Sequence, residues 1–404
     1  MAQAFLPVWP GHACLCAFRR KRLENRKHGC QLGSFRQIGL AAWPDGPRLA
    51  YNSLVTRRSL VLGGLAAALR REKFDEAVRL VSKQVDSGVV GAAVLDVRSG
   101  GRQLAQAFGA AHTKDAVFLL ASITKPMTAT AVMILSDRNE LGLADAVHKF
   151  IPEFRGGDRE RVTVRHLLTH TSGLPDMLPE NEELRKRHAP LKDFVAGTCA
   201  TPLLFPPGTQ VRYQSMGILL AAEIVQRITR RSLPDFLRDE VFRPLGMHAT
   251  SLGLGGRKIP ETMQCQVEQS TDWDWNSSYW RNLAAPWGGA HSNVADLSRF
   301  LRYFARPDRP ILKTATVAAM IADQNQGLKQ PWGLGWMLAQ PSFGHCSSRT
   351  FGHSGSTGTV AWLDPEKDLS CILLTTKPAA VSQKLLLDPV SDVVSEASTT
   401  KTHI

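Results

Sequence analysis

Ser122 and Lys125 stand three positions apart in a stretch of small and apolar residues, and an apolar run over 126–136 predicts a helix directly after them. Side chains at i and i+3 of a helix share one face, with Cβ atoms about 5–6 Å apart. The hydroxyl and the amine are therefore expected side by side, at the helix end whose dipole stabilises negative charge. This is the arrangement of an activated serine nucleophile. A second Ser-x-x-Lys, at 398–401, lies in a polar tail and is interpreted as a chance match.

A serine nucleophile also needs a second proton carrier, and Tyr213 is the first candidate. It precedes a predicted helix and follows the turn Phe-Pro-Pro-Gly at 205–208. A phenol close to a cationic lysine can be pushed toward phenolate and act first as a base and then as an acid. The structural alternative is a tyrosine that only packs at the start of a helix.

The stretch Gly-His-Ser-Gly-Ser-Thr-Gly at 352–358 leads into a predicted strand. Small residues at a strand edge allow a substrate backbone to come close. The backbone N–H groups of Ser122 and Ser356 would then form an oxyanion hole, of which one donor is worth about 10²–10³ in rate. The alternative is an ordinary glycine-rich turn.

Other catalytic motifs are excluded by their spacing. His166 and His170 lack the glutamate of a zinc-peptidase helix, and the stretch 352–356 fails Gly-x-Ser-x-Gly at its last position. The seven cysteines contain no Cys-x-x-Cys pair in the body of the chain, which disfavours a zinc site or a disulfide framework. We therefore expect no metal and no cofactor.

Most of the net charge of +13 belongs to the start of the chain. Residues 1–72 contain 12 basic and 3 acidic side chains, a net of +9, which leaves +4 for the rest. No basic stripe interleaved with aromatic residues follows, so a nucleic-acid partner is not expected.

Residues 1–54 show no usable periodicity and are interpreted as a disordered leader or a mis-translated start. Arg57 and Arg58 precede a short apolar run that ends in three alanines, so 55–70 resemble a twin-arginine export signal. The run is shorter than the ~20 residues of a membrane span, so no stable span is expected. The predicted location is periplasmic or secreted, with an ordinary amphipathic leader and a cytoplasmic protein as the alternative.

The body, 72–404, reads as an α+β domain in which strands open and close the chain and helices fill the middle. No regular structure is expected over 271–292, where Trp273, Trp275, Trp280 and Trp287 lie among polar residues. These tryptophans either line an apolar binding wall or pack their own loop. The predicted strands are 91–97, 103–108, 357–363 and 369–375, and the main predicted helices are 74–85, 126–136, 164–170, 215–231, 233–242, 295–304 and 382–397.

Seven motifs, in order between residues 74 and 376, resemble those of the serine beta-lactamase-like hydrolases. This family includes class C beta-lactamases, D-Ala-D-Ala carboxypeptidases, D-amino-acid peptidases and family VIII carboxylesterases. The motifs are Ala-Ser-Ile-Thr-Lys-Pro at 121–126, Leu-Leu-Thr-His-Thr-Ser-Gly-Leu at 167–174, Pro-Gly-Thr-Gln-Val-Arg-Tyr-Gln-Ser-Met-Gly at 207–217, Pro-Leu-Gly-Met at 244–247, Gly-Gly-Ala-His-Ser at 288–292, Trp-Gly-Leu-Gly-Trp at 332–336 and Gly-His-Ser-Gly at 352–355.

The resemblance implies roles for particular residues. Ser122 would be the acylated nucleophile, Lys125 its proton acceptor and Tyr213 the group that passes the proton to the leaving group. It also implies a beta-lactamase/transpeptidase-like fold: an antiparallel sheet flanked by helices, with a mainly helical subdomain at about 137–345.

The chain departs from the typical beta-lactamase pattern at two positions that would bind substrate. Ser215 stands where Tyr-x-Asn has its asparagine, and His353-Ser-Gly355 replaces Lys-Thr-Gly. A lysine there holds the beta-lactam carboxylate as a permanent cation, whereas histidine is only partly charged near neutral pH. Both changes argue against an efficient beta-lactamase. Trp287 is a further candidate for substrate contact.

The sequence therefore predicts a serine hydrolase that forms an acyl-enzyme with a small ester or a D-amino-acid amide or peptide. An esterase is favoured slightly. The alternative is a beta-lactamase, or a low-turnover penicillin-binding protein that binds peptidoglycan fragments.

Overall fold

The structure is a computed structural model and describes residues 57–397. The expected leader at 1–54, residues 55–56 of the signal-like segment and the Ser-x-x-Lys at 398–401 lie outside the described residues. Arg57 begins helix α1 (Arg57–Asp86), which runs on through the helix predicted over 74–85. The chain divides into units 1–63 and 64–404, and the features below belong to the second. In the described part, no helix is long and apolar enough to cross a membrane.

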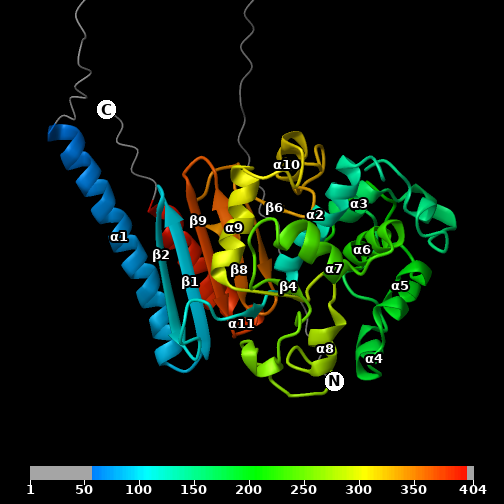
Figure 1. Cartoon of the computed structure of the whole chain (residues 1–404), viewed down its shortest axis with the longest axis horizontal. Helices are drawn as coiled ribbons and strands as arrows, with labels where there is room; N and C mark the ends of the chain where they lie inside the picture. Colours follow the sequence, from blue (N-terminus) through cyan, green and yellow to red (C-terminus); the bar gives the residue numbers. More distant parts are fainter. Residues whose placement is uncertain (1–56, 398–404) are drawn as a thin grey trace, which may run out of the picture. The chain divides into compact units, whose positions relative to one another are not determined.

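One antiparallel sheet of six strands, in the order β2-β1-β9-β8-β7-β6, forms the centre of this unit (Figure 1). The strands predicted at 91–97 and 103–108 are confirmed as β1 and β2, which pair as an antiparallel hairpin, and β1 also pairs with the last strand, β9. The start and the end of the domain therefore meet in one sheet. Its strands are β1 (Ala92–Ser99), β2 (Arg102–Gly109), β6 (Met337–Leu338), β7 (Phe351–Gly355), β8 (Thr359–Asp364) and β9 (Leu369–Thr375).

Helices cover both faces of the sheet, and β9 shows why. Successive side chains of a strand point to opposite faces. Cys371 and Leu373 belong to the core cluster formed with α1 and α12 (Asp388–Glu396), whereas Ile372 and Leu374 belong to the cluster formed with α9 (Val294–Ala305). Strand β9 is therefore buried on both sides. On one of them, α9 crosses the face of β8 and β9 (Figure 1).

Helix α2 (Thr124–Asp137) joins the sheet to the helical part of the molecule. Every residue from 124 to 135 is buried, including Lys125 and three threonines. It packs against α6 (Met216–Thr229), which in turn contacts α3 (Val164–Leu168) and α5 (Leu191–Ala200). The predicted fold class is confirmed, and the boundaries proposed for the helical subdomain stay a prediction.

A second sheet of three short strands, in the order β3-β5-β4, was not predicted. It consists of β3 (Phe118–Leu119), β5 (Ala290–Ser292) and β4 (Ser251–Leu252). The expectation that 271–292 lack regular structure is therefore wrong, because β5 lies here and α8 (Ser278–Leu283) begins where Ser277 accepts the N–H of Trp280 over 3.1 Å. The pairing that makes β5 a strand comes from residues far away in the sequence.

Some predicted helices are divided in the structure. The helix expected over 233–242 is α7 (Leu233–Leu237) followed by a π-helical turn, η4 (Arg238–Phe242). The last helix consists of α11 (Ala379–Ser382), the π-helical η7 (Gln383–Leu387) and α12. Between α3 and α6 the chain also forms α4 (Asn181–Lys186) and α5.

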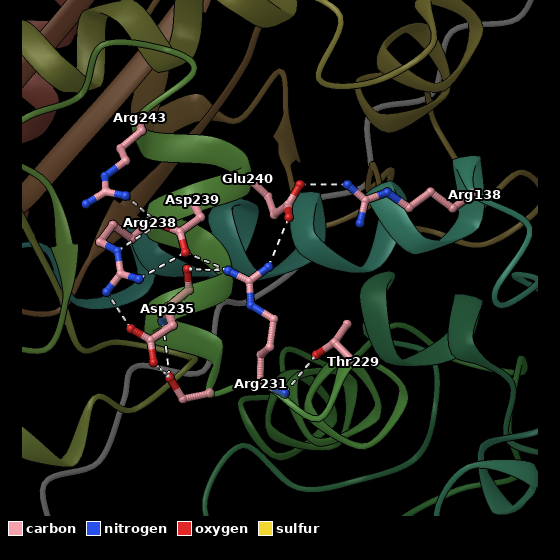
Figure 2. A network of polar contacts seen from close by, with 9 residues as sticks. Arg138, Thr229, Arg231, Asp235, Arg238, Asp239, Glu240 and Arg243 are labelled. Carbon is pink, nitrogen blue, oxygen red and sulfur yellow. Dashed lines mark hydrogen bonds and ion pairs between the residues drawn. The ribbon is translucent and has the colours of Figure 1, made fainter.

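A network of ion pairs fastens η4 to the end of α2 (Figure 2). Arg231 pairs with Asp239 at 2.7 Å and with Glu240 at 3.0 Å, and Glu240 also accepts from Arg138, the residue that caps α2, at 2.6 Å. These side chains are partly exposed, so each pair contributes about 0–1 kcal/mol. The network therefore orients these segments more than it stabilises them.

Candidate active site

Ser122 lies in a tight turn between β3 and α2. Ala121, the residue before it, has a left-handed backbone with φ of 49°, which costs a non-glycine residue about 1–3 kcal/mol. The side chain of Thr124 holds the turn, because its hydroxyl donates to the carbonyl of Ala121 over 2.6 Å and accepts the N–H of Ala290 over 3.0 Å. The turn leaves Ser122 half-buried at the start of α2 while both of its neighbours are buried.

Lys125 faces Ser122 as the spacing predicts. Its amine lies 3.0 Å from the hydroxyl oxygen of Ser122 and 3.1 Å from the backbone carbonyl of Trp287. The side chain is 0% exposed, and this burial lowers the pKa of Lys125 to about 7, against the opposing charge of Asp176. A large share of the amine is therefore neutral near pH 7 and can accept the proton of Ser122.

Tyr213 completes a group of three side chains. Its hydroxyl is hydrogen-bonded to the side chain of Ser122, and the amine of Lys125 lies 4.6 Å from the centre of its ring. Burial and the charge of Asp176 raise the pKa of Tyr213 well above its ordinary value, and the bond to Ser122 only partly opposes them. The phenolate expected from the nearby lysine is therefore not favoured, and Tyr213 is present as a phenol that could donate a proton.

His170 positions Tyr213, a role that the sequence analysis missed. Its carbonyl accepts the N–H of Arg212 over 2.9 Å, and its ring Nδ1 accepts the N–H of Gln214 over 3.1 Å. The rings of His170 and Tyr213 lie 4.7 Å apart. Burial is the main cause that lowers the pKa of His170 well below its usual range, so the ring is neutral and Nδ1 stays an acceptor.

Asp176 is a second residue that the sequence analysis missed. Its carboxylate accepts the hydroxyl of Ser215 over 2.6 Å, and its backbone carbonyl accepts the N–H of Ser215 over 3.2 Å. Ser215 stands where the Tyr-x-Asn motif has its asparagine. Its hydroxyl is therefore already bonded to an acidic residue from the loop that follows α3. The Leu167–Leu174 motif stops two residues before Asp176, which is why no local signal indicated it.

His353 lies on β7 and is neutral. Its side chain is 1% exposed, and its Nδ1 lies 2.7 Å from the carbonyl of Ser354. Burial, helped by the charge of Lys125, lowers the pKa of His353 to about 3. The partial charge expected of this histidine near neutral pH is therefore absent, and β7 supplies no cation at this position.

The connection from β7 to β8 lies tightly against the turn that precedes Ser122. Thr357 and Thr359 donate their hydroxyls to the carbonyls of Leu119 and Leu120, over 2.8 Å and 2.9 Å. A Cβ on Gly355 would overlap the carbonyl oxygen of Leu120, so only glycine fits there. Ser356 follows at an exposed position of the same turn. The close contact between these two segments supports an oxyanion hole formed by the N–H groups of Ser122 and Ser356. The oxyanion hole itself stays a prediction.

Trp287 was expected to contact substrate, but the residue is only 2% exposed. It packs against Phe194 and Trp280, with ring centres 5.9 Å and 6.3 Å away. The part of Trp287 that reaches the site is its carbonyl, which accepts from Lys125. The tryptophans were expected either to line a binding wall or to pack their own loop. The contact between Trp280 and Trp287 fits the second alternative.

The site thus consists of Ser122, Lys125 and Tyr213, with Asp176 and two neutral histidines around them. Within residues 57–397, no three His, Cys, Asp or Glu side chains are grouped so that they could hold a metal ion. The arrangement can abstract the serine proton with a neutral amine and return a proton from a phenol.

Comparison with known proteins gives the family. The beta-lactamase family model matches residues 75–390. Penicillin-binding protein 4 of Amycolatopsis lactamdurans is 31% identical over 296 residues, 68% of this chain and 76% of that protein. Esterase EstB of Burkholderia gladioli is 34% identical over 214 residues, 48% of this chain and 53% of that protein.

A solved structure shows the same fold. The penicillin-binding protein homologue of Caulobacter crescentus superposes with a TM-score of 0.67 at 23% identity, over 80% of this chain and 96% of that one. The family model covers most of the described residues, and the three motif side chains Ser122, Lys125 and Tyr213 meet in one place. The chain belongs to the beta-lactamase family of serine hydrolases.

Proposed function

We propose that the protein hydrolyses small carboxylic esters through an acyl-enzyme on Ser122, with D-amino-acid amides as a second substrate class. The observation that carries the proposal is the neutral amine of Lys125, 3.0 Å from the serine hydroxyl in a site where His353 supplies no cation. This arrangement supports acyl transfer, and a neutral histidine at 353 argues against tight binding of a beta-lactam carboxylate.

The proposed reaction follows from these groups. Lys125 accepts the proton of Ser122 while the serine oxygen attacks the substrate carbonyl. The N–H groups of Ser122 and Ser356 stabilise the negative oxygen of the tetrahedral intermediate. Tyr213, held as a phenol, donates a proton to the leaving alcohol or amine and regains one from Lys125. Water then attacks the acyl-enzyme by the reverse proton path. It gives a proton to Tyr213 while Tyr213 passes its own proton to Lys125, and Lys125 returns that proton to the oxygen of Ser122. This releases the acid and restores Ser122.

The similarity to esterase EstB supports the ester as substrate. The similarity to penicillin-binding protein 4 supports the alternative, a protein that acylates Ser122 with a penicillin and turns it over slowly. Ser215 and the neutral His353 favour the ester, because both replace groups that bind an anionic peptide mimic.

The test is hydrolysis of 4-nitrophenyl butyrate by the protein and by Ser122→Ala, with an intact-mass measurement of the acyl adduct. Turnover and adduct are both expected to disappear in Ser122→Ala. Ser136→Ala, which removes a hydroxyl at the far end of the same helix, is expected to keep both. Full activity of Ser122→Ala would exclude the proposed nucleophile. A penicillin adduct without ester turnover would instead favour the slow penicillin-binding protein.

We further propose that residues 55–70 direct export. The pair Arg57 and Arg58 before an apolar run is the basis of this proposal. Conversion of both arginines to lysine is expected to retain the protein in the cytoplasm of a host with twin-arginine export, as measured by cell fractionation. Equal distribution of the two forms would contradict it.

A further inference from the structure

Asp176 is fixed beside the reacting groups. Its two contacts to Ser215, through the carboxylate at 2.6 Å and through the backbone at 3.2 Å, hold it next to the segment that carries Tyr213. One carboxylate oxygen is used by Ser215, and the side chain remains partly exposed. Asp176 is therefore a negative charge at the site with an oxygen left for a ligand.

The two histidines beside Tyr213 do not balance the charge of Asp176. Among the described groups, Asp176 is the acid whose charge acts on both Lys125 and Tyr213. The two histidines that flank Tyr213, His170 and His353, are neutral. When Lys125 is also neutral, as the first step requires, the free site carries one negative charge.

We propose that Asp176 is a specificity-determining residue, which makes the site select acyl groups that are neutral or positively charged and reject those that carry a carboxylate. The inference rests on the proposed function and narrows its substrate class. An ester of a neutral acid, or an ester or amide of an amino acid with a free amine, fits this site. A beta-lactam or a peptide that presents a carboxylate near Ser215 does not.

The size of the effect follows from Coulomb's law. For a separation of about 8 Å and an effective dielectric constant of about 20, a negative charge favours a cationic acyl group over a neutral one by about thirtyfold. Salt reduces this factor. A structural alternative exists, because Asp176 also holds Ser215 and through it the Tyr213 segment. Loss of that support would slow every substrate by the same factor, whereas loss of charge selection would change their ratio.

The experiment compares three 4-nitrophenyl esters with the same leaving group and similar acyl length. They are the neutral butyrate, the anionic monoester of glutaric acid and the cationic 4-(trimethylammonio)butyrate. The rate of Ser122 acylation is followed by nitrophenol release and by intact mass, so that the comparison does not require turnover. The variants are Asp176→Asn, Ser215→Ala and Glu180→Gln. The last removes an exposed carboxylate four residues further along the chain.

The unmodified protein is expected to prefer the cationic over the anionic ester by at least about tenfold. Asp176→Asn should lower this ratio by about tenfold or more, whatever its effect on the individual rates. Ser215→Ala keeps the carboxylate and should keep a ratio well above one, and Glu180→Gln should leave both rates and ratio unchanged. The inference would be overturned if Asp176→Asn lowered the acylation rates of all three esters by the same factor, or if the unmodified protein showed no preference. Either result would leave the proposed hydrolase activity standing. Absence of any adduct at Ser122 would overturn the proposed function itself.

Discussion

The amine of Lys125 donates to the backbone carbonyl of Trp287 over 3.1 Å, and no carboxylate of residues 57–397 lies within ion-pair distance of it. A carbonyl dipole and a serine hydroxyl do not compensate a buried positive charge. Burial alone is therefore enough to make the amine of Lys125 partly neutral near pH 7. Its availability as a base does not depend on the deprotonation of another group.

The first prediction concerns the pH dependence of acylation. With a neutral ester, kcat/KM should rise with pH through a midpoint near 7 and then level off, because the neutral form of Lys125 is the reactive one. Asp176→Asn should move this midpoint to lower pH, since the charge of Asp176 raises the pKa of Lys125. Initial rates between pH 5 and 9 check both statements, with Glu180→Gln as the control. An unchanged midpoint in Asp176→Asn would show that its charge does not reach the amine.

The second prediction concerns stability. The pKa of Lys125 is about 7 in the folded protein and 10.5 in the reference state, so between these values the unfolded chain binds more protons. The free energy of unfolding therefore rises with pH in this window, by at most about 1.4 kcal/mol per pH unit from this group. Lys125→Met lacks this term, so its stability advantage over the unmodified protein should be largest at pH 7 or below and shrink toward pH 10. Urea unfolding of both proteins at several pH values measures it, and a constant difference would contradict the assignment.

The third prediction separates the phenol from the lysine. Tyr213→Phe keeps the ring beside His170 but removes the proton donor, so kcat should fall by about 10²–10⁴ with a smaller change in KM. The midpoint near pH 7 should persist in the residual activity, because it belongs to Lys125. Steady-state kinetics across pH test this. Disappearance of the midpoint together with the hydroxyl would assign it to Tyr213 instead.

The fourth prediction concerns His170 as a positioning residue. Without an acceptor, the N–H of Gln214 is left unpaired, which costs about 1–3 kcal/mol, and the neighbouring Tyr213 loses its support. His170→Phe should therefore lower kcat more than it changes KM. His170→Asn should restore part of kcat, because asparagine supplies an acceptor and tolerates the left-handed backbone found there, with φ of 61°. Equal losses in both variants would mean that the imidazole does more than accept this bond.

The pairing of Ser122 with Lys125 and much of the fold could be predicted because their signals are local. Ser122 and Lys125 lie one helical turn apart, the hairpin of β1 and β2 closes on its own glycines, and α6 shows a long apolar run. Each of these features is decided within a few neighbouring residues, and spacing or composition expresses it directly.

The supporting residues could not be predicted, because their partners are far away in the chain. Asp176 meets Ser215 across 39 positions, and His170 meets Gln214 across 44. The charge states of Tyr213 and His353 follow from burial, which is a property of the whole fold. In each case the residue type was visible in the sequence, while the environment that decides its role was not.

The close fit of Gly355 against Leu120 has a consequence for protein engineering. Because a side chain at 355 would displace the nucleophile turn itself, a library that diversifies this strand should keep the glycine invariant. Ser354 is partly buried and Ser356 is exposed, so we expect larger side chains to be accommodated more readily at these two positions than at 355. New substrate scope can thus be sought by randomising Ser354 and Ser356 while Gly355, which contacts the turn before Ser122, is kept.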